Sequence, residues 1–129
     1  MSFPADLRYT DQHEWARLDG ATVTVGITSY ATDQLGDVVF VELPAVGRKL
    51  EALKPFGVVE AVKTVSDLYA PMSGQVVEVN TVLVDNPALV NQEPFGRGWM
   101  IRLKPERTED WKGLLSSSDY EKLVEAQHA

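Results

Sequence analysis

The sequence contains no cysteine, and this absence excludes several kinds of chemistry. Disulfide bonds, thiolate metal ligands and a cysteine nucleophile are all ruled out. The only two histidines, His13 and His128, have no partner at a spacing typical of metal ligands. The sequence motifs of metalloproteases, α/β-hydrolases and P-loop enzymes are also missing. We therefore expect no metal site, and the sequence indicates no catalytic residue.

Basic residues are scarce, since twelve Lys and Arg stand against nineteen Asp and Glu and give a formal net charge of −7. An acidic surface repels phosphate groups, which makes nucleic acids and anionic membranes unsuitable partners. No apolar run approaches the length that spans a membrane, and the N-terminus resembles neither a signal peptide nor an Arg-rich transit sequence. We expect a monomer of the bacterial type that resides in the cytoplasm.

The 129 residues match the size of one domain, so residues 1–129 are taken as a single domain. Short Val-rich runs separated by Gly, Pro and Asn predict a mainly β fold with short helices. The expected strands are 14–18, 22–25, 38–41, 57–62, 68–70, 76–79 and 99–103.

Helical patterns occur in two places. One or two turns are expected over residues 29–35, and a C-terminal helical segment over about 107–129. In that segment Ser118 and Glu121 match a capping box. Tyr120, Leu123 and Val124 follow at helical spacing and predict an apolar stripe that packs on the sheet.

One short pattern occurs twice. Residues 36–41 and 74–79 both read G-x-V-V-x-V, which suggests a sandwich or barrel with approximate internal symmetry. The alternative is that the pattern recurs by chance, because Val is common in strands. Gly36 and Gly74 are interpreted as turn residues that use the backbone freedom of glycine.

Lys63 is the residue with the clearest functional context. Strand-like runs flank it without an intervening Gly or Pro, in a segment of about 57–79 that predicts a hairpin with Lys63 at its tip. An amine at such a tip is accessible to an acylating enzyme, and rigid strands give an attached arm a fixed pivot. The alternatives are a solvated lysine without a function and a Schiff-base nucleophile, which requires a desolvated pocket.

The segment around Lys63 resembles the attachment region of lipoyl and biotinyl carriers, and most of all that of glycine cleavage H proteins. Biotin carriers have Met on both sides of the lysine, and the lipoyl domains of 2-oxo acid dehydrogenases have Asp before it, whereas this chain has Val62 and Thr64. H proteins typically read E-S-V-K-A-x-S-D-x-Y-x-P-x-S-G. The matching positions are Glu60, Val62, Lys63, Ser66, Asp67, Tyr69, Pro71, Ser73 and Gly74. The departures at Ala61 and Thr64 exchange one small residue for another.

Other parts of the chain extend the resemblance. The stretch His13-Glu14-Trp15 is similar to the family's N-terminal H-E-W, and residues 36–44 and 94–99 are similar to further family stretches. The resemblance implies a barrel-sandwich hybrid of the lipoyl-domain type with a C-terminal helix. It also implies a non-catalytic carrier with lipoic acid covalently attached to Lys63 as lipoyl-lysine.

The partners that the resemblance implies are the enzymes of glycine cleavage. The arm takes an aminomethyl group from the P protein, a pyridoxal-phosphate glycine decarboxylase, to the T protein, an aminomethyltransferase. The L protein, dihydrolipoamide dehydrogenase, then reoxidises the dithiol. A lipoate-attaching enzyme is a further partner, and Glu60 and Asp67 either aid its recognition of the hairpin or only solvate the strand ends. Glu14 is expected near the arm. The alternatives are a lipoyl relay to other enzymes and an interaction module whose Lys63 is never modified.

Overall fold

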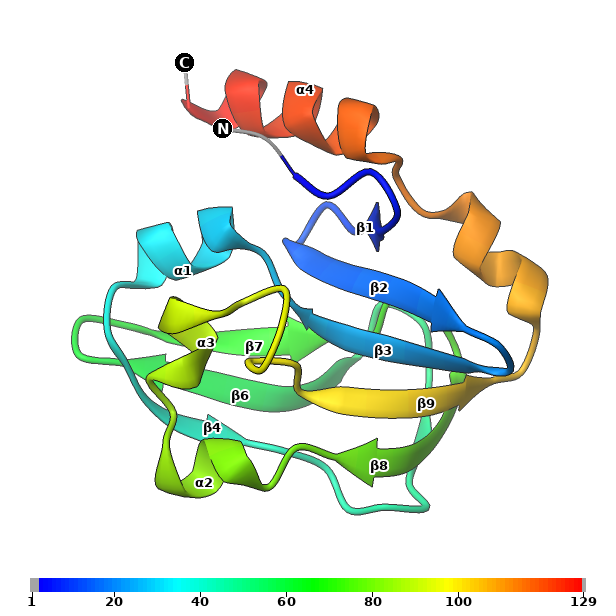
Figure 1. Cartoon of the computed structure of the whole chain (residues 1–129), viewed down its shortest axis with the longest axis horizontal. Coiled ribbons are helices and arrows are strands. Elements are labelled where there is room, and N and C mark those ends of the chain that lie inside the picture. The colour runs from blue at the N-terminus through cyan, green and yellow to red at the C-terminus, as the bar shows by residue number, and fades with distance from the viewer. Residues whose placement is uncertain (1–2, 129) are drawn as a thin grey trace.

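Two β-sheets that pack against each other form the body of the protein, and short helices lie at their edges (Figure 1). This computed structural model describes residues 3–128. The larger sheet has the strand order β1-β2-β3-β9-β8-β5, and the smaller sheet has the order β4-β6-β7. All neighbouring strands pair antiparallel. The predicted mainly β fold with short helices and a C-terminal helix is confirmed.

Each of the seven predicted strand ranges overlaps a strand of the structure, and two further strands in the described part of the chain have two residues each. The larger sheet contains β1 (Arg8–Tyr9), β2 (Glu14–Asp19), β3 (Thr22–Ile27), β5 (Lys49–Leu50), β8 (Gly74–Val79) and β9 (Ile101–Pro105). The smaller sheet contains β4 (Val38–Glu42), β6 (Pro55–Ala61) and β7 (Val65–Tyr69). The helices are α1 (Ser29–Leu35), α2 (Val82–Asp85), α3 (Leu89–Gln92), the 3₁₀ helix η1 (Thr108–Gly113) and α4 (Ser117–His128). None of the helices within residues 3–128 is both long and apolar enough to cross a membrane.

The main core lies between the two sheets, because alternate residues of each strand point inward. Its buried members from the smaller sheet include Val41, Phe56, Val59 and Leu68, and those from the larger sheet include Val25, Val76, Ile101 and Leu103. The core therefore holds the β6–β7 hairpin firmly against the larger sheet.

The two copies of the G-x-V-V-x-V pattern share an irregularity as well as a sequence. The pairing of β4 shifts between Val38 and Phe40, and the pairing of β8 shifts between Val76 and Glu78. Such a bulge inserts one extra residue into a strand. The sequence repeat therefore corresponds to a repeated strand geometry, with one copy in each sheet.

The interpretation of Gly74 as a turn residue is wrong. Gly36 has a φ of 79° at the end of α1, where the freedom of glycine is needed, but Gly74 is not among the residues with positive φ. A Cβ on Gly74 would lie 2.5 Å from the carbonyl oxygen of Lys104. Gly74 therefore permits the close approach of β8 to β9.

The cap of α4 lies two residues before the predicted position. The helix begins at Ser117, and the Ser116 hydroxyl accepts a hydrogen bond from the Asp119 amide at 3.2 Å. Because residues 116–118 are all serine, the sequence offers several equivalent caps.

The apolar stripe of α4 packs on the larger sheet, as the sequence predicts. Tyr120 and Val124 pack with the N-terminal segment and β1, in a second cluster that contains Phe3, Leu7 and Tyr9. The cluster also contains Trp15 of β2, so the helix packs on the larger sheet at its β1–β2 end.

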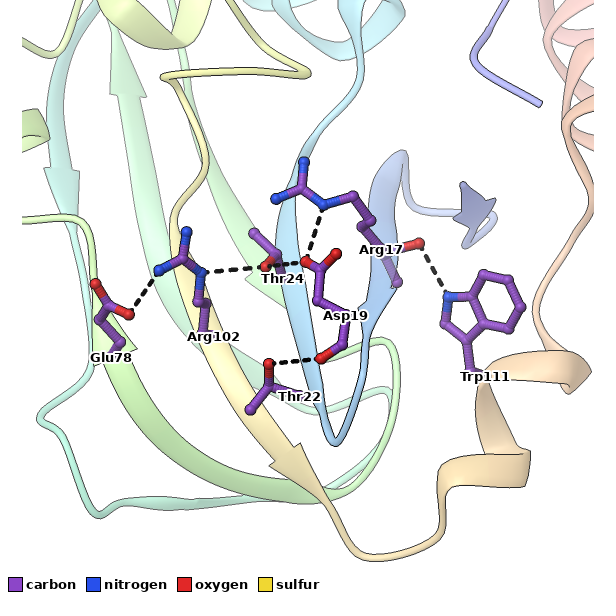
Figure 2. Close-up of polar contacts among 8 residues, drawn as sticks. Arg17, Asp19, Thr22, Thr24, Glu78, Arg102 and Trp111 are labelled. Carbon is purple, nitrogen blue, oxygen red and sulfur yellow. Dashed lines mark hydrogen bonds and ion pairs between the residues drawn. The ribbon is translucent and has the colours of Figure 1, made fainter. Parts of the chain in front are cut away.

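Polar side chains connect the central strands of the larger sheet (Figure 2). The Thr24 hydroxyl donates to Asp19 at 3.2 Å and accepts from Arg102 at 3.3 Å, and Arg102 also donates to Glu78 at 2.7 Å. The indole of Trp111 in η1 donates to the carbonyl oxygen of Ala16 at 3.0 Å. Because the ion pair of Arg102 with Glu78 is partly exposed, it stabilises the fold by less than about 1 kcal/mol. These bonds thus serve mainly to fix strand register.

Candidate functional site

Lys63 lies in the turn of residues 62–64 that joins β6 to β7. The Ala61 amide donates to the Thr64 carbonyl at 2.8 Å, and the Val62 amide donates to the Asp37 carbonyl at 3.1 Å. The first bond closes the turn, and the second ties it to the segment before β4. The Lys63 side chain is exposed. The structure therefore places Lys63 at the tip of a braced hairpin, which projects at one end of the molecule next to α1 (Figure 1).

Glu60 and Asp67 share one side of this hairpin, and Asp67 also borders the cleft described below. Glu60 pairs with Val65, and Asp67 pairs with Val58, so both carboxylates project from the same side of the smaller sheet. Both are exposed, and within residues 3–128 neither forms an ion pair. The structure places the two predicted recognition residues on the hairpin that carries Lys63, both exposed to solvent.

Glu14, the first residue of β2, is only 1% exposed. Its carboxyl group accepts a hydrogen bond from the Thr10 hydroxyl at 2.5 Å and another from the Tyr69 amide at 3.2 Å. Since Tyr69 ends β7, the carboxyl group links the larger sheet to the strand that carries the hairpin. Sequence reasoning singled out Glu14 but foresaw neither of these partners.

The environment of Glu14 changes its ionisation. Burial raises the pKa of Glu14 from its ordinary value of 4.5 to about 8, against the opposing effect of the bonds from Thr10 and Tyr69. At neutral pH the folded protein therefore holds Glu14 mainly as the neutral acid. A raised pKa in a cleft is typical of functional carboxyl groups.

Glu14 lines a cleft of about 320 Å³, to which β2, α1, the hairpin strands and α4 all contribute. The apolar part of its lining is Ile27, Tyr30, Ala31, Leu35, Val59 and Leu68. The polar part is Gln12, His13, Glu14, Gln34, Ser66, Asp67 and Gln127. An apolar wall with a few polar groups is typical of a site for a small ligand. Lys63 itself is not among the lining residues, but Ser66 and Asp67 lie three and four positions after it in the hairpin.

His13 belongs to the cleft for a reason that the sequence did not reveal. Its ring nitrogen Nδ1 lies 2.7 Å from the Tyr120 hydroxyl, and its backbone has a φ of 72°. Burial lowers the pKa of His13. Within residues 3–128, no group of three or more histidine or carboxylate side chains is arranged to hold a metal ion. The only sequence signal was the position of His13 in the H-E-W stretch.

Comparisons with known proteins agree on one family. The family model described as glycine cleavage H-protein matches residues 7–127. The chain is 50% identical over 126 residues to the glycine cleavage system H protein of Bacteroides fragilis, covering 98% of this chain and 100% of the relative. It is 56% identical over 118 residues to the protein of that name from Symbiobacterium thermophilum, covering 92% of each.

A solved structure supports the same assignment. The crystal structure of a glycine cleavage system H protein from Mycobacterium marinum has a TM-score of 0.85 and 44% sequence identity to this chain. The match covers 98% of this chain and 100% of that one. The predicted barrel-sandwich architecture is confirmed, although the two sheets of this chain do not close into a continuous barrel.

Proposed function

The chain belongs to the glycine cleavage H-protein family, and from this premise we propose that it is a carrier whose Lys63 bears lipoic acid in amide linkage. It is a component of the glycine cleavage system, as the names of its relatives state. The observation that carries the proposal is the exposure of Lys63 at the tip of a braced hairpin, inside the sequence motif of the family. We assign no catalytic residue to the chain.

The residues present fit a lipoyl group. When bound, the lipoyl group would supply a disulfide able to accept an aminomethyl group with its own reduction, and a dithiol that the L protein could reoxidise once the group has left at the T protein. The chain contributes the pivot, because the turn bonds of Ala61 and Val62 fix the direction in which Lys63 leaves the hairpin. The apolar wall of the cleft offers the arm a surface that excludes water.

We assign to Glu14 the binding of the amine that the arm carries. A neutral carboxyl group can pass its proton to an amine, and the product is a carboxylate paired with an ammonium ion. This arrangement avoids the cost of burying an unpaired charge. The bonds from Thr10 and Tyr69 remain available to stabilise the carboxylate. Glu14 would thus retain the loaded arm while the carrier travels between enzymes.

Glu60 and Asp67 are proposed to guide the lipoate-attaching enzyme to the hairpin. Their charges lie on one face, next to the lysine to be acylated. Complementary charge on an enzyme would speed the encounter and set its orientation. The P, T and L proteins are the further proposed partners of the modified chain.

The experiment that tests the carrier function is an intact mass measurement with peptide mapping, on protein produced together with lipoic acid and a lipoate-attaching enzyme. We expect a single lipoyl increment located on Lys63. A Lys63→Arg variant keeps the charge but should show no increment, and Lys54→Arg, an exposed lysine at the base of the same hairpin, is the matched control and should be modified normally.

A chain that stays unmodified while an established H protein is lipoylated in the same cells would contradict the proposal. An increment on a lysine other than Lys63 would contradict the assignment of the site but leave the carrier function in place.

A further inference from the structure

Two residues of helix α4 lie at the imidazole of His13 in the cleft. Tyr120 lies 2.7 Å from Nδ1, and Gln127 lines the cleft with the ring and raises the pKa of His13 against the larger effect of burial. Gln127 follows Tyr120 by seven positions, which places both on one face of the helix. His13 has a left-handed backbone conformation that non-glycine residues rarely adopt. The helix thus fixes a strained residue next to Glu14.

The Tyr120 hydroxyl also reaches the opposite wall of the cleft. It lies 2.7 Å from the hydroxyl of Thr28, and this hydroxyl caps α1 by accepting from the Ala31 amide at 3.2 Å. The Thr28 amide in turn donates to the His13 carbonyl at 3.0 Å. Tyr120 therefore joins the two segments that form the walls of the cleft.

One arrangement of protons satisfies these groups together. The Thr28 hydroxyl donates to Tyr120, and the Tyr120 hydroxyl donates to Nδ1 of His13, which must then be neutral and carry its proton on Nε2. Burial, which lowers the pKa of His13, is consistent with a neutral ring. Gln127 of α4 lines the cleft with the ring. In this arrangement the hydroxyl of Tyr120 selects the Nε2–H tautomer of the ring and orients it.

We propose that Tyr120 and Gln127 are positioning residues for the cleft, which act through His13 to set how firmly the cleft retains the lipoyl arm. This inference rests on the proposed function, because it assumes that the arm enters the cleft. In this role α4 does more than pack against the body of the protein, because it also holds in place the wall of the cleft next to Glu14.

The Tyr120 hydroxyl can be removed without removing the ring contacts. The ring stacks on Tyr9 with centroids 4.6 Å apart and planes at 8°, and Phe3 meets its edge at 4.7 Å. Tyr120→Phe keeps this packing. Tyr9→Phe is the matched control, since Tyr9 is equally buried in the same stack but its hydroxyl donates to the Pro4 carbonyl at 2.6 Å, away from the cleft. Gln127→Ala changes only an exposed residue.

The first measurement uses unlipoylated protein and is independent of the arm. Nitrogen-15 NMR of the imidazole rings reports the tautomer of His13, and the signals are assignable because the chain has only two histidines. We expect one dominant Nε2–H tautomer in the parent protein and in Tyr9→Phe. In Tyr120→Phe we expect a mixture of tautomers. A dominant Nε2–H tautomer in Tyr120→Phe would overturn the positioning role.

The second measurement uses the lipoylated chain and follows the reduction of the arm disulfide by a water-soluble phosphine. We expect Tyr120→Phe and Gln127→Ala to be reduced about fivefold faster than the parent, and Tyr9→Phe at the parent rate. Equal rates in all four proteins would overturn the inference. A parent arm reduced as fast as free lipoamide would overturn it together with the arm's place in the cleft, but would leave the attachment to Lys63 intact.

Discussion

Replacing Glu14 with Gln is expected to make the protein more stable than the parent at pH 9 and equally stable at pH 4. Gln is close to Glu in shape and mimics the protonated acid, so it can still accept from Tyr69 and contact the Thr10 hydroxyl. In the unfolded chain Glu14 ionises near its ordinary value of 4.5, whereas burial in the folded protein raises its pKa to about 8. Between these values the unfolded state binds fewer protons, so the stability of the parent falls as the pH rises.

The size of the effect follows from the same shift. The stabilisation that the neutral acid supplies is complete below pH 4.5 and lost by the time the pH passes about 8, and it amounts to about 5 kcal/mol. Urea unfolding of both proteins from pH 4 to 9 measures the difference. Glu125→Gln, an exposed residue of α4, serves as the control for removal of a surface charge. A difference between parent and Glu14→Gln that stays constant across this range would show that Glu14 is ionised in the folded protein throughout.

The hairpin and the buried acid differ in how far the sequence predicts them. The position of Lys63 follows from local pattern, because two strand-forming runs with one short turn have few ways to fold. The partners of Glu14 could not be predicted in this way, since Tyr69 lies 55 positions away in the chain. A pattern of local residues contains no information on which amide a carboxyl group meets after the sheets pack.

The contrast between local patterns and contacts made across the fold also explains the other features that the sequence did or did not predict. The Tyr120 hydroxyl meets His13 across 107 positions, so neither residue shows its role in its own neighbourhood. The helices α2 and α3 have four residues each, which is too short for a helical period to show in the sequence. The serine run before α4 predicts a cap but not which serine provides it. The repeated bulges of β4 and β8, in contrast, accompany a sequence repeat that was visible from the start.

Replacing Gly57 with Ala is expected to destabilise the protein by about 3 kcal/mol. Gly57 lies in β6, and a Cβ at this position would collide with the carbonyl oxygen of Glu42 in β4. Backbone atoms cannot move aside as a flexible side chain can, so β4 and β6 must separate locally. Gly113→Ala is the matched control, because a Cβ there meets no atom within 4 Å and its φ is not positive, and we expect it to change stability by less than about 1 kcal/mol. Urea unfolding of the three proteins checks both values.

The consequence for Lys63 separates this variant from a general loss of stability. The smaller sheet has only three strands, and the β6–β7 hairpin with Lys63 is braced on one side by β4, through strand pairing and through the bond from Val62 to Asp37. Displacing β4 should loosen this brace, so Gly57→Ala should be lipoylated more slowly than the parent even at a temperature where both are folded. If Gly57→Ala is as stable as the parent, β4 can move away from β6 without cost. If it is also lipoylated at the parent rate, the core alone holds the hairpin in place.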